Sequence, residues 1–198
     1  MLNRVFPAAV ASALSLSGAA SAGIIAFNDA SLFALFVSSQ GRQVSTEDFT
    51  AYSGSAATFS GTFANSGGIT WTASASGGMT AGAGWMSTNS AEAMTFTFSQ
   101  GVQGVGGRFF ATDFGFNVQP TFMQVTLSDG SGFIGSISNT TTFTGLYSTG
   151  AAITSISIAV DSGEYPTADN LSVAVVPAPG AAALLGAAGL VGRRRRRA

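Results

Sequence analysis

The sequence predicts an all-β protein: a jelly-roll-like antiparallel β-sandwich with a short N-terminal helix, flanked by a signal peptide and a short C-terminal hydrophobic helix. Apolar and polar residues alternate over several short segments, as they do in half-buried strands. Clusters of Gly, Ser, Asn and Asp separate these segments and indicate turns. Charged residues make up only 9% of the chain, against about 25% in a typical soluble protein. With 16 Phe and a mean hydropathy of +0.37, the chain has enough apolar residues to form a core.

The alternating segments predict the strands of a single domain over residues 23–175. In residues 94–99, Met94, Phe96 and Phe98 alternate with hydroxyl residues. The same pattern occurs at 123–127, 156–160 and 171–175. Neighbouring residues of a strand point to opposite faces, so each segment has one apolar and one Ser/Thr face. Such strands are typical of an antiparallel sheet with one solvated side.

Turns are predicted at residues 65–68, 76–78, 128–130 and 161–163, where Gly follows Ser, Asn or Asp. Residues 130–135 match the letters of a dinucleotide-binding fingerprint, but they follow a predicted turn and precede strand-like sequence. We therefore interpret them as part of a hairpin. A helix is predicted over residues 30–39, capped by Asn28 or Asp29, with Leu32, Phe33 and Phe36 on its inner stripe.

The chain has no Cys, His or Lys. This composition excludes disulfides, Cys/His zinc sites, haem ligation by His and catalysis that depends on imidazole. Glu47 and Asp48 are adjacent acids, but neighbours on a strand point to opposite faces and do not form a catalytic pair. The sequence therefore predicts a protein that is not an enzyme, and a hydrolase remains an alternative only if distant acids meet in the fold.

Residues 1–22 have the three parts of a secretory signal peptide. Arg4 supplies the positive start, an apolar stretch runs to Leu16, and Ala20 and Ala22 form the A-x-A cleavage signal. The predicted mature chain begins at Gly23.

Residues 176–198 combine a Pro-rich start, an apolar run over 180–192 and five arginines. As a helix the apolar run would be about 20 Å long, shorter than the ~30 Å hydrocarbon core of a bilayer. The run is therefore marginal as a permanent membrane span. The arginines would remain at the cytoplasmic interface and stop transfer. These arginines are Arg193, Arg194, Arg195, Arg196 and Arg197.

This tail resembles the PEP-CTERM sorting signal of Gram-negative bacteria, with Ala178 where the usual motif has Glu. The resemblance implies recognition and cutting by an exosortase-type enzyme after transient anchoring in the inner membrane. The matching motif is Val176, Pro177, Ala178, Pro179 and Gly180. The predicted signal peptide adds signal peptidase and the secretion machinery as expected partners.

The domain resembles PEP-CTERM passenger domains in the segments "EDF", "GITW", "GGRFFATDF", "FTGLYS" and "DNLSV". This resemblance implies a secreted β-sandwich associated with exopolysaccharide or biofilm matrix. Removal of both ends would leave two arginines and nine acidic residues, a net charge of −7. Such a charge argues against nucleic acid as a partner.

The sequence thus predicts a secreted or cell-surface matrix component. The alternative is an extracellular carbohydrate-binding module in which Trp85 or Tyr147 stacks on sugar rings. Calcium is the metal that suits the available oxygen ligands. Its candidate ligands are Asp161, Glu164, Asp169 and Asn170.

Overall fold

The computed structural model describes residues 23–161 and 163–176. The predicted signal peptide with its cleavage residues Ala20 and Ala22, residues 177–180 of the sorting motif and the terminal arginines lie outside the described residues. The described residues form thirteen strands and one helix, and the strand pairings are antiparallel. The predicted all-β, jelly-roll-like architecture with a short N-terminal helix is confirmed.

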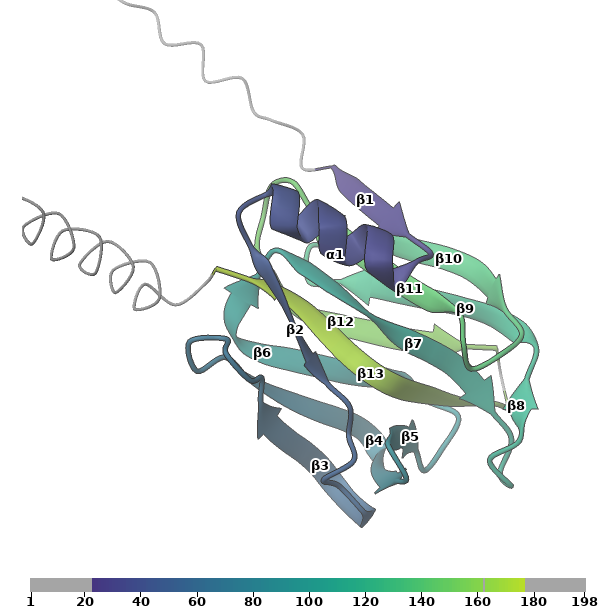
Figure 1. The fold of residues 1–198 in the computed structure, drawn as a ribbon. Helices are drawn as coiled ribbons and strands as arrows, with labels where there is room; N and C mark the ends of the chain where they lie inside the picture. Colours follow the sequence, from purple (N-terminus) through teal and green to yellow (C-terminus); the bar gives the residue numbers. More distant parts are fainter. Residues whose placement is uncertain (1–22, 162, 177–198) are drawn as a thin grey trace, which may run out of the picture.

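The strands form two packed layers that are joined into one hydrogen-bonded path, and β13 and β7 pass in front of β6 and β12 in Figure 1. The first layer contains β1 (Ile24–Phe27), β2 (Gln43–Glu47), β7 (Gly104–Thr112), β11 (Phe143–Ser148) and β13 (Tyr165–Val175). The second contains β3 (Gly54–Thr62), β4 (Thr70–Gly82), β6 (Met94–Val102), β9 (Thr121–Leu127), β10 (Gly132–Ile137) and β12 (Ile153–Val160). Strand β5 (Trp85–Thr88) pairs with both β4 and β13 and so connects the layers, while β8 (Val118–Gln119) pairs with the end of β7.

The core lies between the two layers. Met94 and Phe96 on β6 are fully buried, as are Met123 on β9 and Ile156 on β12. The period-two pattern therefore predicted the inward faces of these strands correctly. Strand β13 differs, because the side chain of Ala174 on its outer face is buried as well. That face is covered by the helix α1.

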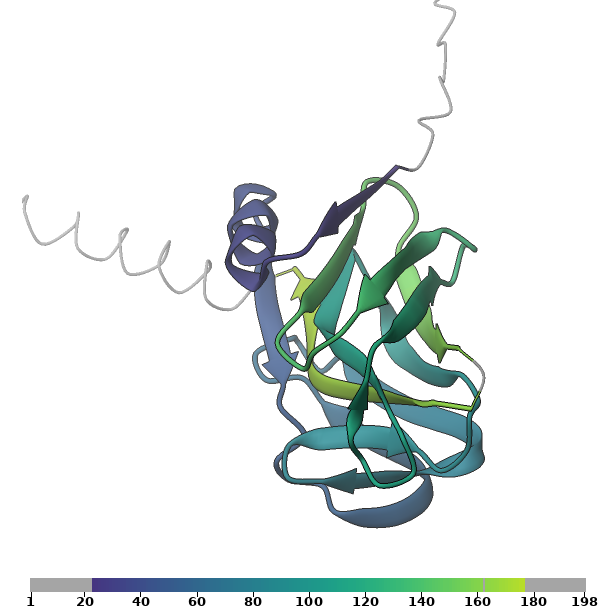
Figure 2. The same cartoon turned by 90° about the vertical axis from the view of Figure 1, so that its right-hand side faces the viewer.

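Helix α1 (Ala30–Ser39) begins where the sequence predicts, because the carboxylate of Asp29 accepts a hydrogen bond of 2.9 Å from the backbone N–H of Leu32. Its predicted inner stripe is partly wrong. Phe33 and Val37 are buried, whereas Leu32 is 57% exposed. The helix lies beside the start of β2 and the end of β13 (Figures 1 and 2). Glycine allows the close contact, since a Cβ added at Gly145 would lie 3.0 Å from the Phe33 ring.

Two of the predicted turns join consecutive strands, as expected: residues 65–68 connect β3 to β4, and residues 128–130 connect β9 to β10. The turn predicted at 161–163 includes residue 162, which lies outside the described residues. The hairpin interpretation of residues 130–135 is also confirmed. The turn predicted at 76–78 is wrong, because these residues lie inside β4. They form an irregularity opposite the register shift between Ala56 and Thr58, where Gly78 adopts a φ of 80°.

Candidate functional site

A groove crosses the outer face of the first layer where β5, β13 and β7 lie side by side. It consists of three hollows of about 410, 160 and 400 Å³. Phe116 lines the first and second hollows, and Trp85, Phe110 and Thr140 line the second and third. Because adjacent hollows share lining residues, we treat them as one groove with an aromatic end, a middle and a polar end.

The polar end exists because β13 changes partners along its length. Its first half pairs with β5 through Thr167 and Ala168, and its second half pairs with β2 from Leu171 onwards. Asp169 and Asn170 lie at this change, where the register with β7 also shifts. A Cβ at position 107 would approach the carbonyl oxygen of Asn170 to 2.7 Å, so glycine on β7 makes room for the irregular backbone.

The aromatic end presents ring surface to solvent. Phe114 is 85% exposed and Phe116 is 48% exposed. The ring centroids of Trp85 and Phe116 lie 4.7 Å apart, and those of Phe114 and Tyr165 lie 6.5 Å apart. Clustered exposed apolar side chains on a soluble protein mark interaction sites. These rings therefore form a platform on which the flat apolar face of a ligand can rest.

The loop that carries Phe114 and Phe116 is organised by Asp113. Its Oδ1 accepts hydrogen bonds from the backbone N–H groups of Gly115 at 2.8 Å and Asn117 at 2.9 Å. The side-chain amide of Asn117 also donates to the carboxylate and is the main reason that the pKa of Asp113 is lowered. The ionised carboxylate thus holds the loop, and with it the aromatic platform, in one conformation.

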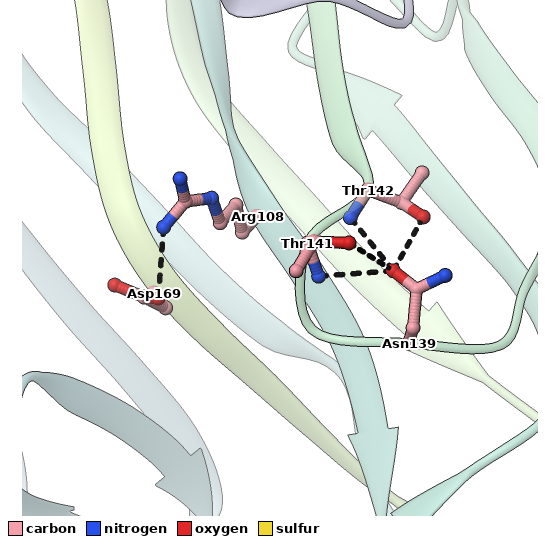
Figure 3. Close-up of polar contacts among 5 residues, drawn as sticks. All are labelled: Arg108, Asn139, Thr141, Thr142 and Asp169. Carbon is pink, nitrogen blue, oxygen red and sulfur yellow. Dashed lines mark hydrogen bonds and ion pairs between the residues drawn. The ribbon is translucent and has the colours of Figure 1, made fainter.

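Charged and amide groups gather at the polar end. Asp169 lies 3.6 Å from the guanidinium of Arg108, which comes from the neighbouring strand β7. Figure 3 shows the loop that contains Asn139 beside this pair. Asn139 Oδ1 accepts hydrogen bonds from the backbone N–H and the hydroxyl of both Thr141 and Thr142, at 2.9 to 3.0 Å. The loop is therefore held by its own side chains, and it places Thr140 in the groove.

Asp48 and Asp169 share the polar end but have opposite shifts in pKa. Hydrogen bonds from the hydroxyl and the backbone N–H of Thr50 lower the pKa of Asp48. Burial raises the pKa of Asp169, and the nearby Arg108 only partly offsets this effect. The fold therefore keeps at Asp169 a carboxylate whose ionised form is disfavoured by its surroundings.

Backbone strain is concentrated around the groove. Five described non-glycine residues have a positive φ, and four of them line the groove or adjoin it. Ala83, Phe116 and Asn170 are lining residues with φ values of 51°, 62° and 57°, and Phe49 follows Asp48 with a φ of 57°. Each left-handed residue of this kind costs about 1–2 kcal/mol. Strain that is retained at one place in a fold is typical of functional sites.

We expect Asp169→Asn to be more stable than the wild type at pH 7. The native state raises the pKa of Asp169 above the unfolded value of 3.8. The native state therefore binds the proton of Asp169 more tightly than the unfolded state does. The protonated carboxyl stabilises the native state below pH 3.8, and this stabilisation is lost as the pH rises through the raised pKa. The variant should have the higher melting temperature at pH 7, and the difference should disappear near pH 3.

A matched control for this comparison is Asp129→Asn in the turn between β9 and β10. Hydrogen bonds from Ser131 lower the pKa of Asp129. This substitution should therefore lower the melting temperature at pH 7, the opposite sign. If Asp169→Asn also melted below the wild type at pH 7, the pairing with Arg108 would outweigh the burial of Asp169.

Of the two aromatic residues predicted to stack on sugars, the structure places only Trp85 in the groove. Tyr147 is 5% exposed and lies beneath α1, with its ring centroid 5.0 Å from that of Phe36. It has no free face for a sugar ring, because the helix covers the outer face of β11. The assignment of Tyr147 as a binding residue is corrected on this ground.

The four predicted calcium ligands do not come together. Asp169 and Asn170 lie in the groove. Asp161 instead accepts hydrogen bonds from the hydroxyl of Thr121 at 3.2 Å and the backbone N–H of Phe122 at 3.4 Å, near the far end of β12. Five extended residues, about 16 Å, separate Glu164 from Asp169. In residues 23–161 and 163–176, no three acidic side chains gather as a metal site.

Sequence reasoning missed Phe114, Phe116, Phe110 and Arg108. A signal was present in "TDFGFNV", where two Phe residues flank a Gly between the turn-forming residues Asp113 and Asn117. Large aromatics in a short turn between strands often stay exposed, as Phe114 and Phe116 do here. They are therefore candidates for a binding surface.

Comparisons with known proteins establish no family. No protein-family model matches the chain, and no curated protein matches it. Among solved structures, a mutant family 29 carbohydrate-binding module complexed with mannohexaose is similar at 12% identity. The match covers 67% of this chain and 92% of that chain with a TM-score of 0.37. A likeness at this level does not transfer a binding site, so the assignment of a ligand rests on the groove itself.

Proposed function

We propose that the protein is a non-enzymatic glycan-binding domain that holds a neutral oligosaccharide or polysaccharide chain in the groove. The observation that carries the proposal is the continuity of the groove from an exposed aromatic platform to an Arg–Asp pair. Ligand sites of this kind combine apolar surface with a few convergent polar groups.

The two ends of the groove match the two kinds of surface on a sugar. The C–H faces of a pyranose ring pack on flat aromatic side chains such as Trp85 and Phe116. Its hydroxyls can both donate to the carboxylate of Asp169 and accept from the guanidinium of Arg108. Four extended residues separate Tyr165 from Asp169, about 13 Å. The groove therefore suits a chain of linked sugars better than a single ring.

The charges of the groove favour a neutral glycan. Asp48, Asp113 and Asp169 line it, and Arg108 is the positive partner of Asp169. The described domain also has nine acidic residues against two arginines. A polyanionic glycan would be repelled by this excess of negative charge.

Hydrolysis, the alternative to binding, would depend on Asp169 as its acid. A glycosidase needs one carboxyl group that is protonated at the working pH, besides a second one that is ionised. Hydrogen bonds from Thr50 favour the ionised form of Asp48, so this carboxylate can accept hydrogen bonds from hydroxyls but cannot serve as the acid. Burial raises the pKa of Asp169 and the nearby Arg108 partly offsets this effect, so Asp169 is the one carboxyl of this pair that hydrolysis could use as the acid.

The proposal is tested by electrophoresis of the wild-type protein in gels that contain soluble glucan, mannan, xylan, alginate or polygalacturonate. We expect retardation by at least one neutral polysaccharide and none by the two anionic ones. Normal mobility in every gel would overturn the proposal. Release of reducing ends that is lost in Asp48→Asn and Asp169→Asn would instead identify a hydrolase.

We also propose that the protein reaches the cell surface or its matrix through the two terminal signals. Their removal would leave the sheet complete, because β1 begins at Ile24 and β13 ends at Val175. A glycan-binding domain released or retained outside the cell would then attach to exopolysaccharide.

Intact mass of the protein from its native host tests this localisation. We expect a species that begins at Gly23 and lacks residues 193–197. A native protein with both ends uncut would contradict the proposal, whatever the groove binds.

A further inference from the structure

Four large apolar side chains are exposed around helix α1, at the end of the domain where β13 ends. Leu32 and Leu35 on the helix are 57% and 69% exposed, Ile25 on β1 is 37% exposed and Val176 is 63% exposed. We call these four residues the helix patch. The groove lies elsewhere, because none of the four lines it.

The residues of the helix patch lie on or next to the elements that α1 covers. Ile25 pairs with Tyr147, whose ring lies against Phe36 of the helix. Val176 follows Ala174 by two residues, and Ala174 packs beneath the helix. Residues that pair directly across two strands point to the same face, so Ile25 lies on the face that carries α1. Val176 directly follows the strand whose end this helix covers.

The helix patch lacks the charge that a solvent-exposed helix usually carries. Residues 23–41 contain one ionisable side chain, Asp29, and its carboxylate caps the helix. The other eight acidic residues of the described domain lie outside this segment. Anionic lipid headgroups would repel the acidic parts of the domain. They would not repel this uncharged, aliphatic surface.

The sequence that follows Val176 indicates which kind of surface the helix patch contacts. Val176 is four residues from Gly180, where the apolar run of residues 180–192 begins. Four residues span at most about 14 Å. If the apolar run is in the bilayer, the helix patch is therefore held within reach of the headgroup region.

We propose that the helix patch docks on the lipid surface while the tail anchors the chain, with Leu32 and Leu35 inserted at the headgroup–acyl boundary. The inference rests on the proposed localisation and on the transient anchoring that the resemblance of the tail implies. Apolar helix faces bind bilayers in this way, and a single weak contact becomes effective only beside a second attachment. Docking would hold residues 177–180 at the interface, within reach of a membrane-embedded processing enzyme. Loss of the tail would then release the domain.

The test uses the full chain in neutral phosphatidylcholine vesicles. The chain has no Cys, so Leu35→Cys provides a single site for the environment-sensitive fluorophore NBD. Ile134→Cys is the matched control, because this exposed aliphatic residue lies on β10, in the other layer. We expect the label at position 35 to emit at shorter wavelength and to be quenched several-fold more by nitroxide lipids than the label at 134.

The outcomes separate the inference from the anchor on which it rests. A chain that fails to float with vesicles overturns both the anchor and the docking. A chain that floats with equal quenching at both positions overturns the docking alone. A spectral shift at position 35 that disappears at a much lower protein-to-lipid ratio indicates contact with a second copy and also overturns the docking.

Discussion

Trp85→Ala is expected to weaken glycan binding by about 30-fold, which corresponds to about 2 kcal/mol for an aromatic anchor in a binding site. Trp85 lines two of the three hollows, and its ring centroid lies 4.7 Å from that of Phe116. Alanine would remove the centre of the platform and leave Phe116 without its partner. Titration calorimetry with the neutral polysaccharide that retards the wild type in gels measures the loss.

Two variants control for this result. Trp85→Phe keeps a flat ring and should recover most of the affinity. Phe122→Ala removes an aromatic that is 63% exposed on β9, outside the groove, and should bind as the wild type does. Unchanged affinity in Trp85→Ala, with its melting temperature also unchanged, would show that the groove is not the binding site.

The sequence predicted those parts of the fold that depend on local patterns. Alternation identified the inward faces of β6, β9 and β12, because a strand buried on one side requires period two. Asp29 was a predictable cap, since its carboxylate needs only the N–H group three residues ahead. The inner stripe of the helix was predicted less well. Which stripe is buried depends on the glycines of β7 and β11 beneath it, and their position is a property of the tertiary structure.

The candidate site was less predictable because its residues come together through long-range pairing. Asp169 lies beside Arg108 and Thr167 lies opposite Ser87, although these partners are far apart in the chain. The number of residues between two such partners follows no repeat in the sequence, so a sequence pattern cannot predict which residues pair. For the same reason the burial of Tyr147 was not predictable, since it depends on where α1 packs. Trp85 could be proposed because a Gly-rich segment is an unusual place for a core aromatic.

Trp71→Ala is expected to lower the free energy of unfolding by about 3–5 kcal/mol, a large share of the 5–15 kcal/mol that is typical of a native domain. The Trp71 ring is fully buried, 5.5 Å from the ring centroid of Phe49 and 6.1 Å from that of Phe96. Its indole N–H donates to Glu47 Oε2 at 3.3 Å, so alanine would leave a cavity and would remove the donor to this oxygen, while Oε1 keeps the backbone N–H of Phe49.

Urea unfolding followed by circular dichroism measures this loss of stability, and Trp71→Phe separates its two parts. The Phe variant keeps most of the buried ring and removes the indole donor, so it should lose much less than the Ala variant. If both variants lost the same amount, the bond to Glu47 would account for the effect and the cavity would not. A loss of less than about 1 kcal/mol in Trp71→Ala would mean that the surrounding rings close the space, contrary to the close packing expected of a protein core.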